Sequence, residues 1–320
     1  MYSADNTRMS TPNDALAAHS PSLPPELATV RDFVRWGASA FVRRGLVFAH
    51  GTDNALDESF HLTLWALKLP PDLPAIYLEA TLTQPERALV WKLLNERLNS
   101  RKPAAYLMGE IQFCGLPFTV DERVLIPRSP IGEMIGKHFH PWLTSSPTRI
   151  LDLCAGSGCI GIACAYAFPE AEVDLAELDF GALQVAKSNI LRHRAHPQVR
   201  AWESDLFAGL PSDARYELIV SNPPYVPTAE VDELAPEFRH EPRLALEAGA
   251  DGMEIVVRLL AEAPHYLTDD GLLVCEIGGS QEEFLARFPD LPVSWPDFER
   301  GGDGVFVIGR RELVRWLQKR

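Results

Sequence analysis

The sequence predicts an α/β fold, with an open and mostly parallel sheet that carries helices on both faces, preceded by a small helical region. From residue 149 onward, short apolar runs alternate with segments of helical periodicity, which is typical of parallel strands joined by crossover helices. Residues 26–100 show helical periodicity alone. The chain has 320 residues, of which 46% are hydrophobic, and this is enough for two packed regions.

The N-terminal part is expected to be a polar tail followed by helices. Residues 1–25 lack the apolar core of a signal peptide and are interpreted as a disordered tail. Apolar residues recur at helical spacing from Leu27 onward. Thr83 and Glu86 form the pattern of a capping box, which predicts the start of another helix. We therefore expect a helical domain over residues 26–102.

The rest of the chain is expected to be a hairpin linker and an α/β domain. Residues 103–128 contain alternating apolar residues broken by turn-forming ones, which predicts a β-hairpin. The α/β domain is expected over residues 129–320. Its seven predicted strands span residues 149–153, 172–178, 199–203, 217–221, 272–277, 293–298 and 304–308.

The charge of the chain is unevenly distributed. Residues 1–102 carry 11 acidic and 11 basic side chains, whereas residues 103–320 carry 33 acidic and 19 basic ones, so the net charge of −14 lies in the second part. Such a surface repels phosphate backbones, which argues against direct nucleic-acid recognition. It would attract a basic protein, although acidity that serves only solubility is an equally good interpretation.

The remaining composition favours a cytoplasmic protein. The five cysteines form no C-x-x-C pair and no disulfide framework, which indicates a reducing compartment. His138 and His140 have no further ligands at metal spacing and are interpreted as surface residues, so no metal is expected. The sequence also contains no apolar run of the ~20 residues that a membrane span requires.

The first candidate site residues follow the first predicted strand of the α/β domain. The cofactor-binding candidates there are Asp152, Cys154, Ala155, Gly156, Ser157 and Gly158. In doubly wound folds this turn lies beside the carboxyl ends of the strands, where ligands bind. The segment is neither the G-x-G-x-x-G dinucleotide fingerprint nor a P-loop, because it lacks the glycine register and the lysine. A simple tight turn remains the alternative interpretation.

Two further candidates follow the next strands. Glu177 ends the second predicted strand, about 20 residues after the loop, where a carboxylate accepts hydrogen bonds from ribose hydroxyls. Asp205 and Leu206 follow the third strand, where the carboxylate would accept a hydrogen bond from an adenine amine and the apolar side chain would contact the ring. The alternatives are a solvated strand end for Glu177 and a turn residue for Asp205.

The most specific segment is Asn222-Pro223-Pro224-Tyr225, after the fourth strand. The prolines make the loop rigid. The Asn222 side-chain oxygen and the Pro223 carbonyl are two acceptors that match the two donors of a planar –NH₂ group, and Tyr225 offers a flat face for it. We therefore predict Asn222, Pro223 and Tyr225 as catalytic residues. Asn222 would also contact the cofactor, and Pro224 would contact the substrate.

Together these residues resemble the class I S-adenosylmethionine methyltransferases that carry an N-P-P-Y motif. The resemblance implies a Rossmann-like fold with a seven-stranded sheet, S-adenosylmethionine as the methyl donor, and a planar uncharged nitrogen as the acceptor. The group includes protein glutamine methyltransferases and adenine-amino methyltransferases of nucleic acids. The acidic second part of the chain argues against the adenine-amino enzymes.

The segment from Arg101 to Arg128 narrows the resemblance to the protein glutamine methyltransferases, which implies Phe113 and Arg128 as substrate-binding residues. Residues 129–133 read S-P-I-G-E, where the release-factor branch typically has P-D-T-E. This departure resembles the branch that methylates the third protein of the large ribosomal subunit. The implied partner is that basic ribosomal protein, either free or in a ribosome precursor, with the release-factor enzyme as the alternative. The helical domain is then a candidate for substrate recognition.

Overall fold

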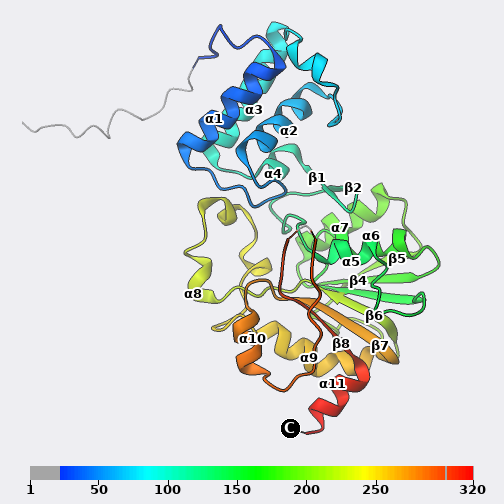
Figure 1. The fold of residues 1–320 in the computed structure, drawn as a ribbon. Helices are drawn as coiled ribbons and strands as arrows, with labels where there is room; N and C mark the ends of the chain where they lie inside the picture. Colours follow the sequence, from blue (N-terminus) through cyan, green and yellow to red (C-terminus); the bar gives the residue numbers. More distant parts are fainter. Residues whose placement is uncertain (1–21, 300, 320) are drawn as a thin grey trace, which may run out of the picture.

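The computed structural model describes residues 22–299 and 301–319, and Figure 1 shows a helical region above a larger α/β region. Residues 1–21 of the predicted tail lie outside the described residues. Residues 22–25 lie against the helices, because Arg87 Nη2 donates hydrogen bonds to the carbonyls of Pro24, at 3.1 Å, and Pro25, at 3.2 Å.

The helical region is built from amphipathic helices that share one apolar core. Its elements are α1 (Val30–Arg44), α2 (Ala55–Leu67), the 3₁₀ helix η1 (Ala75–Glu79), α3 (Gln84–Ser100) and α4 (Ala104–Met108). Phe33, Phe41 and Leu62 are fully buried in this core. The predicted capping box of Thr83 and Glu86 is present at the start of α3.

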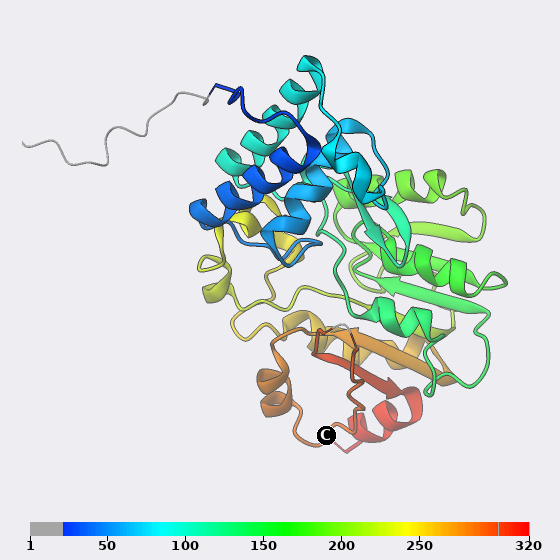
Figure 2. The ribbon, with the colours of Figure 1, turned by 45° about the horizontal axis from the view of Figure 1, so that its top comes forward.

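The predicted hairpin follows the helices. Strand β1 (Glu110–Phe113) pairs with β2 (Leu116–Thr119) in antiparallel register. Within the predicted hairpin linker of residues 103–128, residues 104–108 form the short helix α4, and residues 124–126, although apolar, form no strand. Figure 2 shows the hairpin between the helices and the sheet.

The main sheet confirms the predicted fold class. Its order is β5-β4-β3-β6-β7-β8, and every neighbouring pair is parallel except β7 with β8. The strands are β3 (Arg149–Leu153), β4 (Glu172–Glu177), β5 (Val199–Glu203), β6 (Tyr216–Ser221), β7 (Leu267–Glu276) and β8 (Val305–Gly309). Strand β3 begins in the middle and the chain later returns to its other side with β6, so a topological switch point lies between these two strands.

The predicted strand over residues 293–298 is wrong within the described part of the chain. Only Ser294 pairs with β8, in an isolated antiparallel bridge to Val307. Pro292 and Pro296 flank this bridge. Because proline has no backbone N–H to donate to a ladder, pairing cannot extend in either direction.

Helices cover both faces of the sheet, and the alternation of strand side chains produces two cores. One core lies under α5 (Ile131–Gly136), α6 (Cys159–Ala167) and α7 (Phe180–Arg192) and takes Ile150 and Val173 from the sheet. The other lies under α9 (Glu254–Tyr266), α10 (Gln281–Arg287) and α11 (Arg310–Leu317) and takes Leu151 and Ile219. No helix of the described residues is long and apolar enough to cross a membrane.

A long connection between β6 and α9 joins the two regions. It contains α8 (Thr228–Val231) and the 3₁₀ helices η2 (Pro236–His240) and η3 (Arg243–Ala245). Within it, Glu237 accepts a hydrogen bond from the backbone of Val47, at 3.1 Å, and pairs with Arg101, at 2.9 Å. These contacts place the helical region beside the carboxyl ends of the parallel strands.

Candidate active site

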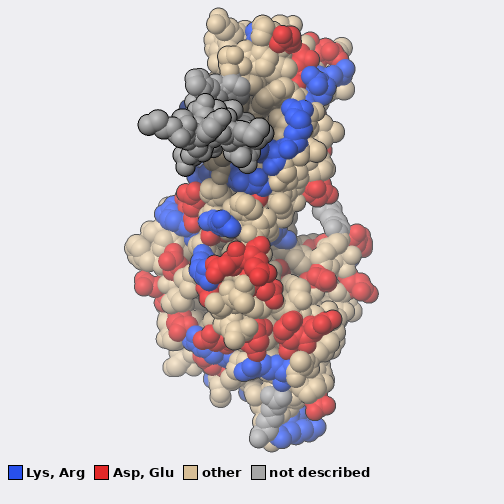
Figure 3. Space-filling model, turned by 90° about the vertical axis from the view of Figure 1, so that its left-hand side faces the viewer, with Lys and Arg blue, Asp and Glu red and all other residues tan. Residues whose placement is uncertain are grey.

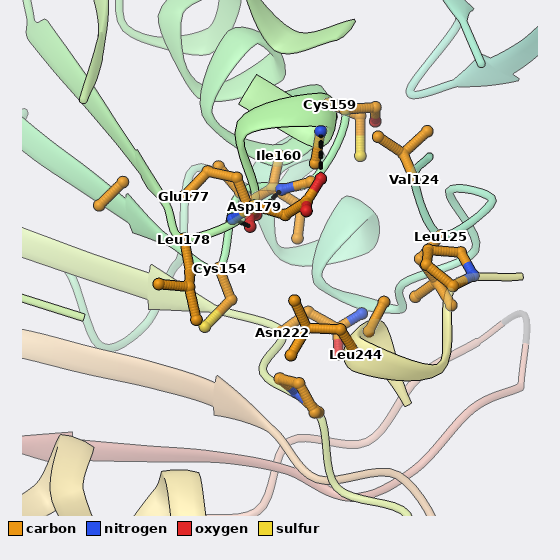
Figure 4. Close-up of a pocket in the computed structure, with 18 of the residues that line it drawn as sticks. Val124, Leu125, Cys154, Cys159, Ile160, Glu177, Leu178, Asp179, Asn222 and Leu244 are labelled. Carbon is orange, nitrogen blue, oxygen red and sulfur yellow. Dashed lines mark hydrogen bonds between the residues drawn. The ribbon is translucent and has the colours of Figure 1, made fainter. Parts of the chain in front are cut away.

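A cavity of about 370 Å³ lies at the carboxyl ends of β3, β4, β5 and β6. Its size is within the range of small-molecule sites. One wall comes from the linker, between Arg123 and Ser129, and another from the connection after β6, between Pro242 and Glu247. In Figure 4, Glu177 and Leu178 lie on one side of the cavity, and Val124 and Leu125 on the other.

The structure brings most of the predicted site residues together in this one cavity. Those that line it are Cys154, Ala155, Gly156, Ser157, Glu177, Asp205, Leu206, Asn222, Pro224 and Arg128. They come from four strand ends and from the linker, which are far apart in the sequence. Their convergence follows from parallel strands whose carboxyl ends meet at one edge of the sheet.

Glu177 is held by the backbone around it. Its Oε2 accepts a hydrogen bond from Gly156 N, at 2.8 Å, and its Oε1 accepts one from Asp179 N, also at 2.8 Å. The side chain is 9% exposed, and burial raises the pKa of its carboxyl group despite these bonds. The carboxylate therefore has a fixed direction and further acceptor capacity for a ligand.

The loop after β5 is shaped by a serine. Ser204 Oγ donates to the carbonyl of Leu206, at 2.6 Å, and accepts from Gly209 N, at 2.8 Å. Asp205 lies at the cavity rim, where its Oδ1 pairs with Arg258 at 2.9 Å. The side chain is 48% exposed. Asp205 Oδ2 has no hydrogen bond or ion pair to the described residues and remains an acceptor at the cavity rim.

Asn222 carries an acceptor without a partner. Its Oδ1 is buried and has no hydrogen bond to any of the described residues. The side chain lies at the edge of the cavity, next to Leu244 in Figure 4. Because a buried polar atom without a hydrogen bond costs free energy, this oxygen indicates a ligand that donates to it.

Five predicted site residues do not line the cavity. Asp152, which is 1% exposed, lies below the loop, where its Oδ2 accepts from Gly161 N at 2.8 Å. Burial raises the pKa of its carboxyl group to about 7. Gly158 caps the start of α6, behind the loop. These two residues support the loop from the side away from the cavity. They were predicted to bind the cofactor because the sequence does not show on which side of the loop a residue lies.

The other three are Pro223, Tyr225 and Phe113. Pro223 is buried between Asn222 and Pro224. The Tyr225 hydroxyl points to Glu276, at 3.4 Å. Phe113 is 7% exposed and packs against Phe118. Neither aromatic ring lines the cavity, so the catalytic role predicted for Tyr225 and the substrate contact predicted for Phe113 stay predictions.

Arg128 is fixed at the cavity wall by a buried acid. Its Nη1 and Nη2 contact Glu241 Oε1 and Oε2 at 2.5 and 2.9 Å. Glu241 also accepts from Ile126 N, at 3.0 Å, and lies 3.4 Å from His50 Nε2. Burial favours a high pKa for Glu241, but His50 and Arg128 outweigh it and lower the pKa to about 2. The guanidinium is thus neutralised before any ligand arrives.

The charges around the cavity suit a cationic ligand. Glu177 and Asp179 line it and form no ion pair with the described residues, whereas the basic residues that line it, Arg123 and Arg128, are each paired with an acid. The other two acids of the lining, Asp205 and Glu247, are paired with Arg258 and Arg243. A pyrophosphate would meet repulsion here, and a sulfonium would not. The acceptors at Glu177 and Asp205 match the hydroxyl and amine donors of a nucleoside. The residues therefore fit S-adenosylmethionine.

Several cavity residues were not predicted from the sequence. They are Leu125, Ile160, Leu178, Asp179, Leu244, Ala245 and Ile255, among others. Asp179 carried a detectable signal, since it caps α7 by accepting from Ala182 N at 2.7 Å. The apolar residues carried none, because an isolated leucine in a loop does not show which way it faces.

Comparisons with known proteins agree with this geometry. The family model described as the methyltransferase small domain matches residues 138–253. Two ribosomal protein uL3 glutamine methyltransferases of Xylella fastidiosa, from strains 9a5c and Temecula1, are each 46% identical over 298 residues, which cover 93% of this chain and 95% of each relative. The chain belongs to the uL3 glutamine methyltransferase family. It is an S-adenosylmethionine-dependent methyltransferase, as the cavity indicates.

Among solved structures, a methyltransferase from Pyrococcus furiosus matches with a TM-score of 0.44 and 20% identity, over 61% of this chain and 89% of that one.

Proposed function

We propose that this uL3 glutamine methyltransferase family member transfers a methyl group from S-adenosylmethionine to the side-chain amide nitrogen of a glutamine in ribosomal protein uL3, as a step in ribosome biogenesis. The observation that carries the proposal is the buried, unpartnered Asn222 Oδ1 at the edge of the cofactor cavity. An amide –NH₂ donates two hydrogen bonds, and a protonated amine would instead require a negative partner at this point.

The residues of the chain would act by orientation. A carboxamide nitrogen is a poor nucleophile, and S-adenosylmethionine supplies a methyl group that is already activated. Asn222 Oδ1 would accept one N–H of the glutamine and the Pro223 carbonyl the other, which directs the nitrogen and stabilises the positive charge that develops on it. Arg128 and Leu244, which both line the cavity, would help to exclude water. No general base is required, because the product loses its proton readily.

The two regions would divide the work. We assign substrate recognition to the helical region at residues 26–102, connection to the linker at residues 103–128, and chemistry to residues 129–320. The contacts of Glu237 with Val47 and Arg101 support this division, since they hold the helices next to the cavity mouth. The free thiols of the described cysteines support a cytoplasmic site of action.

The substrate is tested by direct competition. The purified chain is incubated with labelled S-adenosylmethionine, equal amounts of purified uL3 and purified release factor, and ribosomal RNA. We expect label in uL3 only. A preference for release factor would show that residues 129–133 do not identify the substrate branch, and label in added ribosomal RNA would favour an adenine-amino methyltransferase.

A further inference from the structure

Tyr225 is tightly packed on the side of the Asn222 loop. At Gly278, which has a φ of +49°, an added Cβ would lie 2.6 Å from Tyr225 Cε2. At Gly252, an added Cβ would lie 2.2 Å from the Tyr225 carbonyl oxygen. Ser280 Oγ donates to that same oxygen at 3.0 Å. Both the ring and the backbone of Tyr225 are therefore held by the segments that follow β7 and precede α9.

A buried carboxylate, that of Glu276, contacts the Tyr225 hydroxyl. Glu276 is the last residue of β7 and is 5% exposed. Its Oε2 accepts from Ser129 Oγ at 2.5 Å, within the range of charge-assisted O–H···O bonds. Its Oε1 accepts from the Tyr225 hydroxyl at 3.4 Å, which is longer than the about 2.7–2.8 Å that is usual for O–H···O bonds. One side chain thus connects the linker to the N-P-P-Y loop.

The placement of Glu276 is costly, and the proposed chemistry does not use it. Burial raises the pKa of its carboxyl group to about 6, although the Ser129 hydroxyl, the Arg128 charge and the Tyr225 hydroxyl act in the opposite direction. Glu276 does not line the cavity, so it does not touch the reacting atoms. A buried acid that serves only packing would be replaced at little cost by an apolar side chain.

The loop geometry connects Tyr225 to Asn222. Only Pro223 and Pro224 separate the two residues, and each proline fixes its own φ. The two prolines therefore leave the loop few ways to adjust, so a displacement of Tyr225 should also displace Asn222. A misplacement of about 1 Å in a reacting group costs roughly a hundredfold in rate.

We propose that Glu276 is a positioning residue for methyl transfer, which ties the Tyr225 hydroxyl to Ser129 and thereby fixes the direction of the Asn222 side-chain oxygen. The inference rests on the proposed function and explains how Asn222 and Pro223 keep the geometry that would bind the glutamine amide. Glu276 acts through Tyr225, so removing either partner of this bond should have the same consequence as removing both.

The test is a double-mutant cycle of Glu276→Gln and Tyr225→Phe, with kcat and KM measured on purified uL3. Tyr225→Phe removes the hydroxyl donor of the bond. Glu276→Gln removes the carboxylate charge and replaces one of its two acceptor oxygens by an –NH₂ donor, so Ser129 and Tyr225 no longer each meet an acceptor oxygen. Both substitutions change little volume. We expect each single variant to lose at least about tenfold in kcat, with KM within about twofold, because positioning acts on the transition state. The double variant should be no slower than the slower single variant.

The matched control is Asp174→Asn, since Asp174 is also a buried strand acid, 3% exposed, that accepts from the Tyr216 hydroxyl at 2.9 Å but lies away from the cavity. It should keep wild-type kcat. Calorimetry with S-adenosylhomocysteine should give wild-type affinity for all variants.

Two results would overturn the inference: wild-type kcat in either single variant, or losses that multiply in the double variant. If Glu276→Gln does not fold, Tyr225→Phe decides alone, because wild-type kcat there means that the hydroxyl bond positions nothing. An inactive wild-type chain would instead count against the proposed function. An active wild type with unaffected variants counts against the role of Glu276 only.

Discussion

The role of Asn222 can be separated from a merely structural one. Its Oδ1 is buried and unpartnered, so Asn222→Ala should fold normally and bind S-adenosylmethionine with near wild-type affinity. Loss of one preorganised transition-state partner typically costs about 10²–10³ in rate, and we expect a single-turnover rate lower by at least about a hundredfold. Melting temperature, cofactor affinity and single-turnover rate are measured on one preparation.

Asn95 offers the matched control for this experiment. It is another buried asparagine with an unpartnered Oδ1, but it lies in α3, outside the cavity. Asn95→Ala should keep the single-turnover rate. If Asn222→Ala lost stability and cofactor affinity together with activity, Asn222 would only maintain the shape of the loop.

Glu177 should act on cofactor binding. Its carboxylate is directed by Gly156 and Asp179 and would accept charge-assisted bonds from the ribose. Glu177→Ala should therefore weaken S-adenosylmethionine binding by roughly 1.5–3 kcal/mol in calorimetry. Glu203→Ala is the control, because Glu203 occupies the same register on β5 but is exposed and outside the cavity. If Glu177→Ala binds S-adenosylmethionine with unchanged affinity, then Asp179 and not Glu177 is the residue that binds the ribose.

Between elements, the Glu241 contacts predict a pH dependence of stability. The carboxyl group of Glu241 has its pKa lowered from an ordinary 4.5 to about 2, since His50 and Arg128 outweigh burial. An unfolded chain takes up this proton near pH 4.5, and the folded chain does so only near pH 2. The stabilisation is therefore complete above about pH 4.5 and is lost as the pH falls toward 2.

Urea unfolding of the wild type and of Glu241→Gln tests this linkage. The difference in their free energy of unfolding should be largest at neutral pH and should shrink as the pH falls below about 4.5. A difference that stays constant or widens in acid would show that Glu241 is not charged in the folded protein. The glutamine keeps an acceptor oxygen for Ile126 N and loses the charge together with the second oxygen, which Arg128 Nη2 contacts.

For the whole molecule, the acidic α/β region predicts electrostatic steering of a basic substrate. Figure 3 shows Asp and Glu side chains gathered over the middle and lower part of one face, below the helical region. The value of kcat/KM for uL3 should fall as salt is raised from about 0.05 M to about 0.3 M, because screening shortens the reach of the attraction. Cofactor affinity is measured at the same salt concentrations as a control. If kcat/KM does not change with salt, the acidic surface does not steer the substrate and serves solubility only.

The sequence predicted the parts of the site that depend on the order of strands. Glu177, Asp205 and Asn222 could be found because each follows a strand of a parallel sheet, and such strand ends meet. Leu244 could not be found, since its place depends on how the connection after β6 folds back. Phe113 and Tyr225 do not line the cavity, and the sequence could not show this because an aromatic residue packs equally well against a ligand or a core.

The fold class followed from alternating periodicity, but the number of strands did not. The segment with Val293 has the composition of a strand, yet Pro292 and Pro296 reduce it to a single bridge. The buried acids Glu241 and Glu276 also had no local signal. Each is defined by partners more than 100 residues away in the sequence, such as Arg128 and Ser129.

The most direct measurement of the central claim is to locate the transferred methyl group by tandem mass spectrometry, after the purified chain has reacted with S-adenosylmethionine and unmodified uL3. The proposed function predicts one added methyl group on the side-chain amide nitrogen of a single glutamine, and none when that glutamine is replaced by glutamate. A methyl group on a lysine amine, on the main chain or at several scattered residues would contradict it.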